Sequence, residues 1–179
     1  MREISHLLWL QSPVGKELTD GEARELFMIS RREAYKQGEK LFDEGDEANA
    51  LFLLADGEVE VHKRGHSGNS ALLARMAPGS ILGEMGMLLR EPRSSRAVVI
   101  SPAATVLRVS VKDFQDNLAQ NPTVAVKLIH ALARVLAGRL RDINQRVADI
   151  AERNVNQSAH EQIEEFASFK KKLLTDWSY

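Results

Sequence analysis

Glycines interrupt the chain at short intervals between residues 33 and 113, and this punctuation restricts the fold more than any other feature. Glycine adopts positive φ at little cost, so it is favoured where a chain reverses direction. Short β-like runs lie between the glycines. The glycines at the expected reversals are Gly38, Gly45, Gly57, Gly65 and Gly68. Many short strands with turn signals at this spacing predict a closed or double-sheet β roll.

One of these runs shows the alternation of a half-buried strand. In GEVEVHK, Val59 and Val61 fall on one face of the strand. Glu58, Glu60 and His62 fall on the other face. We therefore expect the valines to face the inside of the roll. The stretches ALLARMAPGSILGE and RAVVISPAATVLRVS predict further short strands.

Helical segments are expected on both sides of the roll. Thr19 and Glu22 form a capping-box pattern that predicts a helix start near Asp20. After the roll, a helical pattern begins at Pro122 and continues to Asn154, because proline is tolerated in the first turn of a helix. The predicted organisation is a helical segment 1–32, a β roll 33–120, a long helix 121–154 and an amphipathic tail 155–179.

Apolar residues in the long helix recur at the spacing of a coiled coil. The two alternating series are Ile129, Leu136, Ile143 and Ile150, and Ala133, Leu140, Val147 and Asn154. This seam predicts a parallel two-helix coiled coil, and therefore a homodimer through residues 129–154. The alternative is a stripe that packs on the roll of its own chain. The tail has an apolar side, suited to packing on the dimer or docking a partner, that contains Ile163, Phe166, Phe169, Leu173 and Trp177.

Composition excludes several classes of function. The 24 basic and 25 acidic residues nearly cancel, which argues against chain-wide electrostatic binding of nucleic acid. The absence of cysteine excludes disulfides, zinc–thiolate sites and thiol catalysis. No apolar run approaches the roughly 18–20 residues of a membrane span, and the N-terminal stretch lacks the pattern of a signal peptide. We expect a cytoplasmic protein with no membrane or nucleic-acid partner.

The stretch GEMGMLLREPRSSRAVV, from Gly83 to Val99, carries the chemistry. A short helix is expected after Gly83, and exposed N–H groups at a helix start attract anions. Arg93 follows ten residues later with donors arranged to fork onto a phosphate, and Ser94 adds a hydroxyl. Glu84, a carboxylate beside this anion site, suits a pair of sugar hydroxyls. A phosphate and a ribose held side by side describe a nucleotide.

The chain from Tyr35 to Val99 resembles the cyclic nucleotide-binding domains of catabolite-activator-like regulators, kinase regulatory subunits and gated channels. The stretches that carry the resemblance are GEKLFDEGDEANALFLLADGEVEV, LLARMAPGSILGEMGMLL and PRSS. The residues at the family's spacing are Gly38, Gly45, Gly57, Gly79, Gly83, Glu84 and Arg93. With its flanking helices, the resemblance covers residues 20–145. It implies an α+β fold: a double-stranded β-helix (jelly roll) with flanking helices and a long C-terminal dimerisation helix.

The resemblance also implies a ligand, a cyclic nucleotide, with cAMP as the first choice. The segment from Gly83 would be the phosphate-binding cassette, with Arg93 on the cyclic phosphate and Glu84 on the ribose 2′-hydroxyl. The other residues expected at the ligand are Gly83, Met85, Ser94 and Ser95 in the cassette, Val61 and Leu73 beside the base, and Arg139 and Leu140 on the helix that closes over the purine. The implied protein is a non-catalytic sensor that signals through its C-terminal helix to an unidentified downstream protein.

Arg96 departs from the family pattern, which carries a small hydroxyl residue at that position. Because that hydroxyl residue is associated with guanine preference in the family, the resemblance implies cAMP rather than cGMP as the ligand. If Arg96 points into the pocket, it adds a second positive charge and suits a more anionic ligand. We expect it to point outward, because burying an unpaired guanidinium is costly.

Three other functions compete with this one. A DNA-binding regulator needs a helix-turn-helix domain after the long helix, and only 25 residues follow Asn154. A metal-dependent β-roll enzyme needs converging histidines, and only His62 and His66 are near each other. The main alternative is a ligand-free domain that acts as a dimerisation or docking module, although the presence of both Arg93 and Glu84 argues against it. We expect neither an enzyme nor a metal site.

Overall fold

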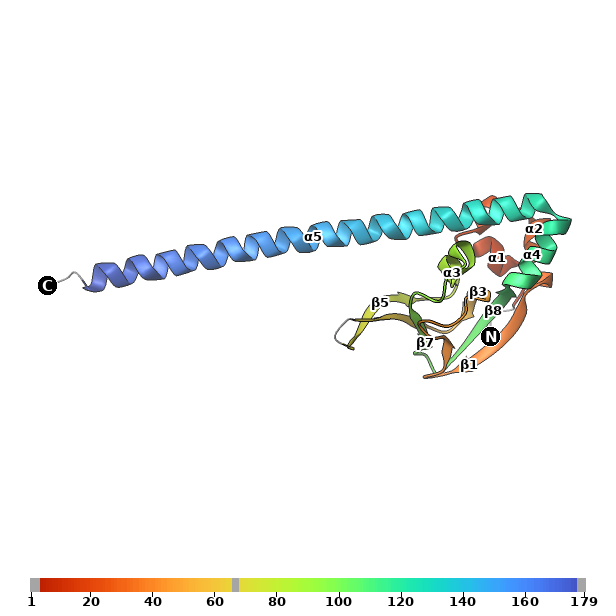
Figure 1. Ribbon diagram of the computed structural model, residues 1–179, viewed down its shortest axis with the longest axis horizontal. Coiled ribbons are helices and arrows are strands. Elements are labelled where there is room, and N and C mark those ends of the chain that lie inside the picture. Colours follow the sequence, from red (N-terminus) through yellow and green to blue (C-terminus); the bar gives the residue numbers. More distant parts are fainter. Residues whose placement is uncertain (1–3, 66–67, 177–179) are drawn as a thin grey trace. The chain divides into compact units, whose positions relative to one another are not determined.

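The computed structural model describes residues 4–65 and 68–176 of the 179-residue chain (Figure 1). The chain divides into two compact units, one that ends at Val135 and one that begins at Leu136. The first unit contains the described strands and the residues of the predicted cassette. The second unit consists of the distal part of the last helix.

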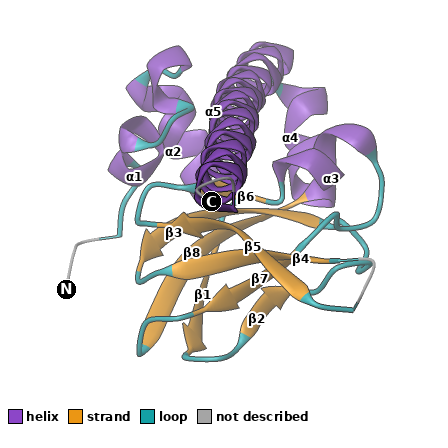
Figure 2. Cartoon of the chain, turned by 90° about the vertical axis from the view of Figure 1, so that its left-hand side faces the viewer, coloured by secondary structure: helices purple, strands orange, loops and turns teal. Residues whose placement is uncertain are grey.

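Two four-stranded antiparallel sheets form the centre of the first unit (Figure 2). In spatial order, the first sheet contains β1 (Arg31–Lys36), β8 (Ala103–Ser110), β3 (Ala50–Asp56) and β6 (Ile81–Leu82). The second contains β2 (Lys40–Phe42), β7 (Arg96–Val99), β4 (Val59–Arg64) and β5 (Ser70–Met76). Strands distant in sequence are neighbours in both sheets, as in a jelly roll. The predicted α+β fold with its β roll is confirmed.

Three short helices precede the first strand: α1 (Leu7–Gln11), the 3₁₀ helix η1 (Gly15–Glu17) and α2 (Asp20–Met28). The predicted capping box is present at the start of α2. Thr19 Oγ1 accepts a hydrogen bond from the Glu22 backbone N–H at 3.3 Å, and the Thr19 N–H donates to Glu22 Oε2 at 2.7 Å. The helix therefore begins where the local sequence predicts.

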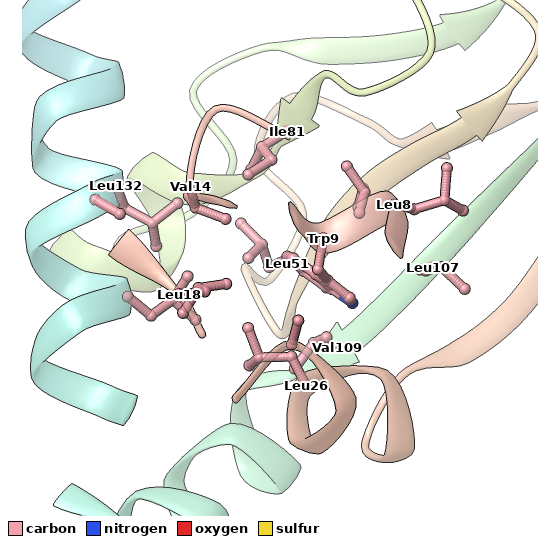
Figure 3. Close-up of a cluster of buried hydrophobic side chains, with 14 of the residues drawn as sticks. Leu8, Trp9, Val14, Leu18, Leu26, Leu51, Ile81, Leu107, Val109 and Leu132 are labelled. Atoms are coloured by element: carbon pink, nitrogen blue, oxygen red, sulfur yellow. The ribbon is translucent and has the colours of Figure 1, made fainter. Parts of the chain in front are cut away.

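A hydrophobic cluster joins these helices to the first sheet (Figure 3). Leu51 of β3 and Leu107 of β8 are buried on the sheet side of this cluster. Trp9 of α1 is fully buried, and its Nε1–H donates to Ser30 Oγ at 3.3 Å. Leu132, from the last helix, completes the cluster in the same unit. The helices are thus part of the core and not appendages to the roll.

Helix α4 (Val111–Gln120) lies inside the range predicted as β roll, and no helix was predicted there. Ser110 Oγ accepts from the Asp113 backbone N–H at 2.9 Å and donates to Asp113 Oδ2 at 2.6 Å. This cap holds the first turn of α4. The Ser-x-x-Asp pattern at this point is the sequence signal that could have predicted the helix.

Helix α5 (Pro122–Asp176) starts at the predicted proline and continues past Asn154 through the segment predicted as a separate tail. Within the first unit, its inner residues Val124, Leu128 and Leu132 are buried in the hydrophobic cluster. Its exposed apolar residues include Val126, Ile129, Leu140, Ile143 and Val147. Several other predicted positions lie outside the residues whose side chains the structure describes: Ile150, Asn154, Ile163, Phe166, Phe169, Leu173 and Trp177.

None of the helices in the described part of the chain combines the length and apolar composition that a membrane span requires. From Asn154 to Asp176 the backbone is one uninterrupted helix, so this stretch holds no helix-turn-helix.

Candidate functional site

Gly83 opens the cassette in a backbone conformation that favours glycine. Its φ of 83° lies in the left-handed region, immediately before α3 (Glu84–Leu89). A β-carbon at this position would lie 2.4 Å from Arg93 Nη1 and 3.0 Å from the Ala50 carbonyl oxygen. The missing side chain therefore makes room for the Arg93 guanidinium against the backbone.

Helix α3 packs closely against the turn between β2 and β3, and a second glycine, Gly86, makes this contact possible. A β-carbon on Gly86 would lie 2.2 Å from Ala48 Cβ. At the end of the helix, Arg90 has φ 57°, and its N–H donates to the Gly86 carbonyl oxygen at 3.0 Å. This left-handed residue terminates α3 after six residues. The close packing of Gly86 against Ala48 and the end of the helix at Arg90 together set the position of the cassette.

Arg93 is tied to the roll by its backbone and by its side chain. Its N–H donates to the Asp46 carbonyl oxygen at 2.8 Å, and its carbonyl oxygen accepts from the Gly45 N–H at 2.9 Å. Arg93 Nη1 donates to the Gly83 carbonyl oxygen at 3.1 Å, and Nη2 donates to that of Ala50 at 2.6 Å. The residue is 4% exposed. The guanidinium thus lies between the start of the cassette and strand β3.

Two aromatic rings lie against the Arg93 guanidinium. Its central carbon is 4.5 Å from the centroid of Phe42 and 5.6 Å from that of Phe52. Burial, followed by the positive charge of Arg108, lowers the pKa of Arg93 from its ordinary value, and the carboxylates of Asp46 and Glu84 oppose this shift. A buried guanidinium with a second cation nearby favours the binding of an anionic group.

One donor of Arg93 has no partner among the described residues. Arg93 Nε is buried and makes no hydrogen bond among the described residues. A buried donor without an acceptor costs about 1–3 kcal/mol. Together with the cradle at Gly83, this unpaired donor fits the expectation that Arg93 faces an anionic group.

The other cassette residues differ in how exposed they are. Glu84 is 4% exposed in the first turn of α3, whereas Met85 is 42% exposed. Ser94 is exposed and its hydroxyl points toward Met85 Sδ at 3.8 Å, and Ser95 is half-buried. Lys63 Nζ donates to the Ser94 carbonyl oxygen at 2.7 Å, which ties the end of the cassette to β4. These cassette residues lie within the single segment 83–95, and their contacts with a ligand stay a prediction.

The residues predicted beside the base differ in their surroundings. Val61 of β4 is partly buried and packs against the second hydrophobic cluster inside the roll. Leu73 is 51% exposed on β5, next to the irregularity in the β4–β5 pairing. Arg139 and Leu140 belong to the second unit, so their predicted closure over the purine stays a prediction.

Arg96 lies on the outer face of the roll. In β7, Ala97 and Val99 are buried, so the alternation of the strand places Arg96 on the opposite face. Arg96 pairs across the sheet with His62, and its Nη2 donates to Ser70 Oγ at 3.3 Å. The expected outward orientation of Arg96 is confirmed. A shallow hollow of about 90 Å³ on this face is lined by Asp43, Glu44, His62, Arg64, Gly68, Ser70 and Arg96.

A larger cavity of about 350 Å³ lies next to the Arg93 guanidinium and the two aromatic rings. Its lining is Tyr35, Leu41, Phe42, Asp46, Glu47, Asn49, Phe52, Arg93 and Arg108.

Among the described residues, no group of three or more His, Asp and Glu side chains could hold a metal ion. His66, one of the two neighbouring histidines in the sequence, lies outside the described residues.

Sequence reasoning missed the residues that hold Arg93 in place. Phe42 and Phe52 were assigned no role, and the Ala50 carbonyl oxygen lies 43 residues away along the chain. Every residue has a backbone carbonyl oxygen, so the sequence does not indicate which one accepts a hydrogen bond from Arg93. The aromatic residues are visible in the sequence, and Phe42 stands three positions before Gly45, whose N–H binds the Arg93 backbone.

Comparison with known proteins agrees with this geometry. The sequence model of the family described as "Cyclic nucleotide-binding domain" matches residues 32–121. The chain is similar to the Cyclic AMP receptor protein of Thermus thermophilus, with 33% identity over 131 residues, which make up 73% of this chain and 58% of that protein. It is also similar to Glutaminase 1 of Bradyrhizobium diazoefficiens, with 33% identity over 137 residues, or 76% of this chain and 21% of that protein.

The fold has a similar relative among solved structures. The crystal structure of the Thermus thermophilus Catabolite Activator Protein aligns with a TM-score of 0.67 and 31% identity. The alignment covers 78% of this chain and 63% of that one. This chain therefore spans less than two thirds of either the receptor protein or the solved relative.

Proposed function

We propose, from the premise that this chain belongs to the cyclic nucleotide-binding domain family, that it is a non-catalytic sensor of cAMP. The observation that carries this proposal is the buried Arg93, whose unpaired Nε and glycine cradle suit a phosphate. The similarity to a cyclic AMP receptor protein supports cAMP as the first ligand to test. The cytoplasmic location expected from the sequence stays a prediction.

The proposed ligand contacts follow the cassette. Arg93 binds the cyclic phosphate through its guanidinium, and Glu84 accepts hydrogen bonds from the ribose hydroxyls. The remaining proposed contacts are Gly83, Met85, Ser94 and Ser95 around the phosphate and ribose, Val61 and Leu73 beside the base, and Arg139 and Leu140 over the purine. Arg96 faces the outside of the roll and takes no part in this contact set.

The signal is proposed to leave the domain through α5. The first turns of α5 are packed in the core of the ligand-binding unit through Val124 and Leu128. A ligand that favours one arrangement of the cassette and α5 shifts their equilibrium by its differential affinity for the two states. The opposite face of α5 exposes a heptad series, Val126, Ile129, Leu140, Ile143 and Val147. We propose that a second copy of the chain covers this face, and that closure is communicated through the dimer to a downstream protein.

Titration with cyclic nucleotides tests the proposal. Calorimetry and thermal unfolding of the full chain with cAMP, cGMP and a cyclic dinucleotide are expected to show binding of cAMP and a rise in melting temperature, because a ligand that binds only the folded state stabilises it. Arg93→Lys removes the forked contact and is expected to weaken cAMP binding by about 1.5–3 kcal/mol, or roughly 10- to 150-fold.

The matched control is Arg24→Lys, an exposed arginine of α2 outside the cassette, which is expected to bind cAMP as the wild type does. If none of the nucleotides binds at millimolar concentration, the ligand-free docking module becomes the better account of this domain. Equal binding by Arg93→Lys and wild type would refute the assigned phosphate contact.

A further inference from the structure

The position of the Arg93 guanidinium is fixed in two different ways. The carbonyl oxygens of Gly83 and Ala50 accept hydrogen bonds from Nη1 and Nη2, and these contacts set its position in the plane of the group. The hydrogen bonds restrict movement perpendicular to that plane less strongly than movement within it. Phe42, whose ring centroid lies 4.5 Å from the central guanidinium carbon, limits movement in this second direction.

The guanidinium also has space into which it could move. The cavity of about 350 Å³ is lined by Arg93, by Phe42 and Phe52, and by a second cation, Arg108. Arg108 is held by Asn49 Oδ1 at 3.2 Å and by Glu33 Oε1 at 3.8 Å. The guanidinium and the ring of Phe42 therefore contact each other at the wall of this open volume. A smaller or non-aromatic side chain at this position would enlarge that volume and remove the attraction of the ring face.

We infer that Phe42 is a positioning residue for the anion site, which holds the Arg93 guanidinium by a cation–π contact where it would meet a ligand phosphate. The inference rests on the proposed function for the identity of the ligand. The positioning itself is a property of the unliganded protein. Phe52 is 3% exposed and lies farther from the cation, at 5.6 Å, so it packs mainly in the core, whereas Phe42 is only half-buried.

The first test uses the full chain without ligand. The Nε–H signal of Arg93 in a proton–nitrogen correlation spectrum is assigned by its loss in Arg93→Lys. Phe42→Leu is expected to move or broaden this signal, because the ring face is lost, and Phe42→Tyr is expected to preserve it. Phe114→Leu, which truncates a buried aromatic residue in the other hydrophobic cluster, is the control and should leave the signal unchanged.

The second test measures cAMP affinity with the same variants. Phe42→Leu is expected to raise the Kd about tenfold, as for the loss of one cation–π contact, whereas Phe42→Tyr restores it. Phe114→Leu keeps the wild-type Kd. An unchanged Arg93 signal in Phe42→Leu overturns the inference, and so does an equal loss of affinity in Phe42→Tyr and Phe42→Leu. If the wild type binds no cyclic nucleotide, the proposed function fails, and the spectrum alone decides whether Phe42 positions Arg93.

Discussion

At the scale of single residues, the absence of a side chain at Gly83 is as important as the presence of one at Arg93. The guanidinium occupies the space that a β-carbon on Gly83 would take. The glycine also supplies the left-handed turn that leads into α3. One position thus satisfies a backbone requirement and a requirement for space next to the anion site.

Gly83→Ala and Gly79→Ala separate these two requirements. Both glycines have positive φ, 83° and 93°, so both substitutions carry a backbone strain of about 1–2 kcal/mol. A β-carbon on Gly79 meets nothing within 4 Å, whereas one on Gly83 meets Arg93. We expect both variants to lose stability in urea unfolding, and only Gly83→Ala to lose cAMP binding. Normal cAMP affinity in Gly83→Ala would show that the guanidinium can move without consequence.

The sequence predicts the roles of some residues near the site and not of others. Arg93 and Glu84 were proposed as ligand contacts from their spacing after Gly83, because residues of one short segment can reach one ligand, and these contacts stay a prediction. The outward orientation of Arg96 followed from the alternation of a strand and the cost of burying a charge. The role of Phe42 could not be predicted, since its contact with Arg93 depends on how two sheets close around the side chain.

At the scale of elements, the seat of α3 depends on two small residues. Gly86→Ala would place a methyl group 2.2 Å from Ala48 Cβ, which forces α3 away from the β2–β3 turn. We expect Gly86→Ala to lower the free energy of unfolding by about 1–3 kcal/mol, the usual cost of overpacking. Adding Ala48→Gly removes the opposing methyl group and should restore part of this loss. Denaturant unfolding of the two single variants and the double variant measures the coupling.

Helices α2 and α5 are joined by an ion pair that links residues 105 positions apart. Lys127 Nζ lies 2.7 Å from Glu22 Oε1 and 3.0 Å from Oε2. Desolvation, the largest single effect, raises the pKa of Glu22, but hydrogen bonds from Lys127 and Thr19 outweigh it and lower the pKa overall. A lowered pKa in the folded state stabilises the protein at pH values above the ordinary pKa of about 4.3. This stabilisation is lost as the pH falls through the lowered value.

Lys127→Met tests the pair. We expect it to reduce the free energy of unfolding by about 1 kcal/mol at pH 6, and the difference from wild type should shrink as the pH falls below about 4. Lys112→Met, which removes an exposed pair with Asp116 on α4, serves as the control and should change stability little. A Lys127→Met difference that is constant from pH 6 to pH 3 would contradict the assigned role of Glu22.

Elements were predicted where a local signal marks them. The capping box placed α2, and Pro122 placed the start of α5, since both signals act within one turn of helix. The roll was predicted from its glycines and its alternating valines. Helix α4 was missed because it follows β8 directly and its Ser110 cap was not recognised. The predicted boundary after Asn154 has no counterpart in the backbone, which stays helical to Asp176.

At the scale of the whole molecule, helix α5 carries a series of exposed apolar residues that a single copy of the chain does not cover. Leu140, Ile143 and Val147 are 59%, 56% and 60% exposed, and they recur at coiled-coil spacing. Val126 continues the series one heptad before Ala133, within the ligand-binding unit. A dimer interface along this seam would therefore include residues of the first unit, which contains the β roll.

Leu140→Asp tests the proposed dimer. A charge at the centre of an apolar seam is expected to convert a dimer into a monomer, because the carboxylate would be buried without a partner. Arg141→Asp, one position away and outside the seam, is expected to leave the dimer intact. Sedimentation equilibrium of the three full-length proteins measures the change. A wild-type chain that is monomeric at every concentration would rule out the seam as a homodimer interface.

The sequence by itself determined the family, the roll and its cassette segment, the capped helix α2 and the heptad series, because each of these depends on spacing or periodicity along a short stretch of chain. Only the tertiary structure decided what surrounds Arg93: the Ala50 carbonyl oxygen, the faces of Phe42 and Phe52, and the nearby charge of Arg108. It also decided that Lys127 meets Glu22. These contacts join distant segments, and they form only after strand register and sheet closure have set which residues face each other.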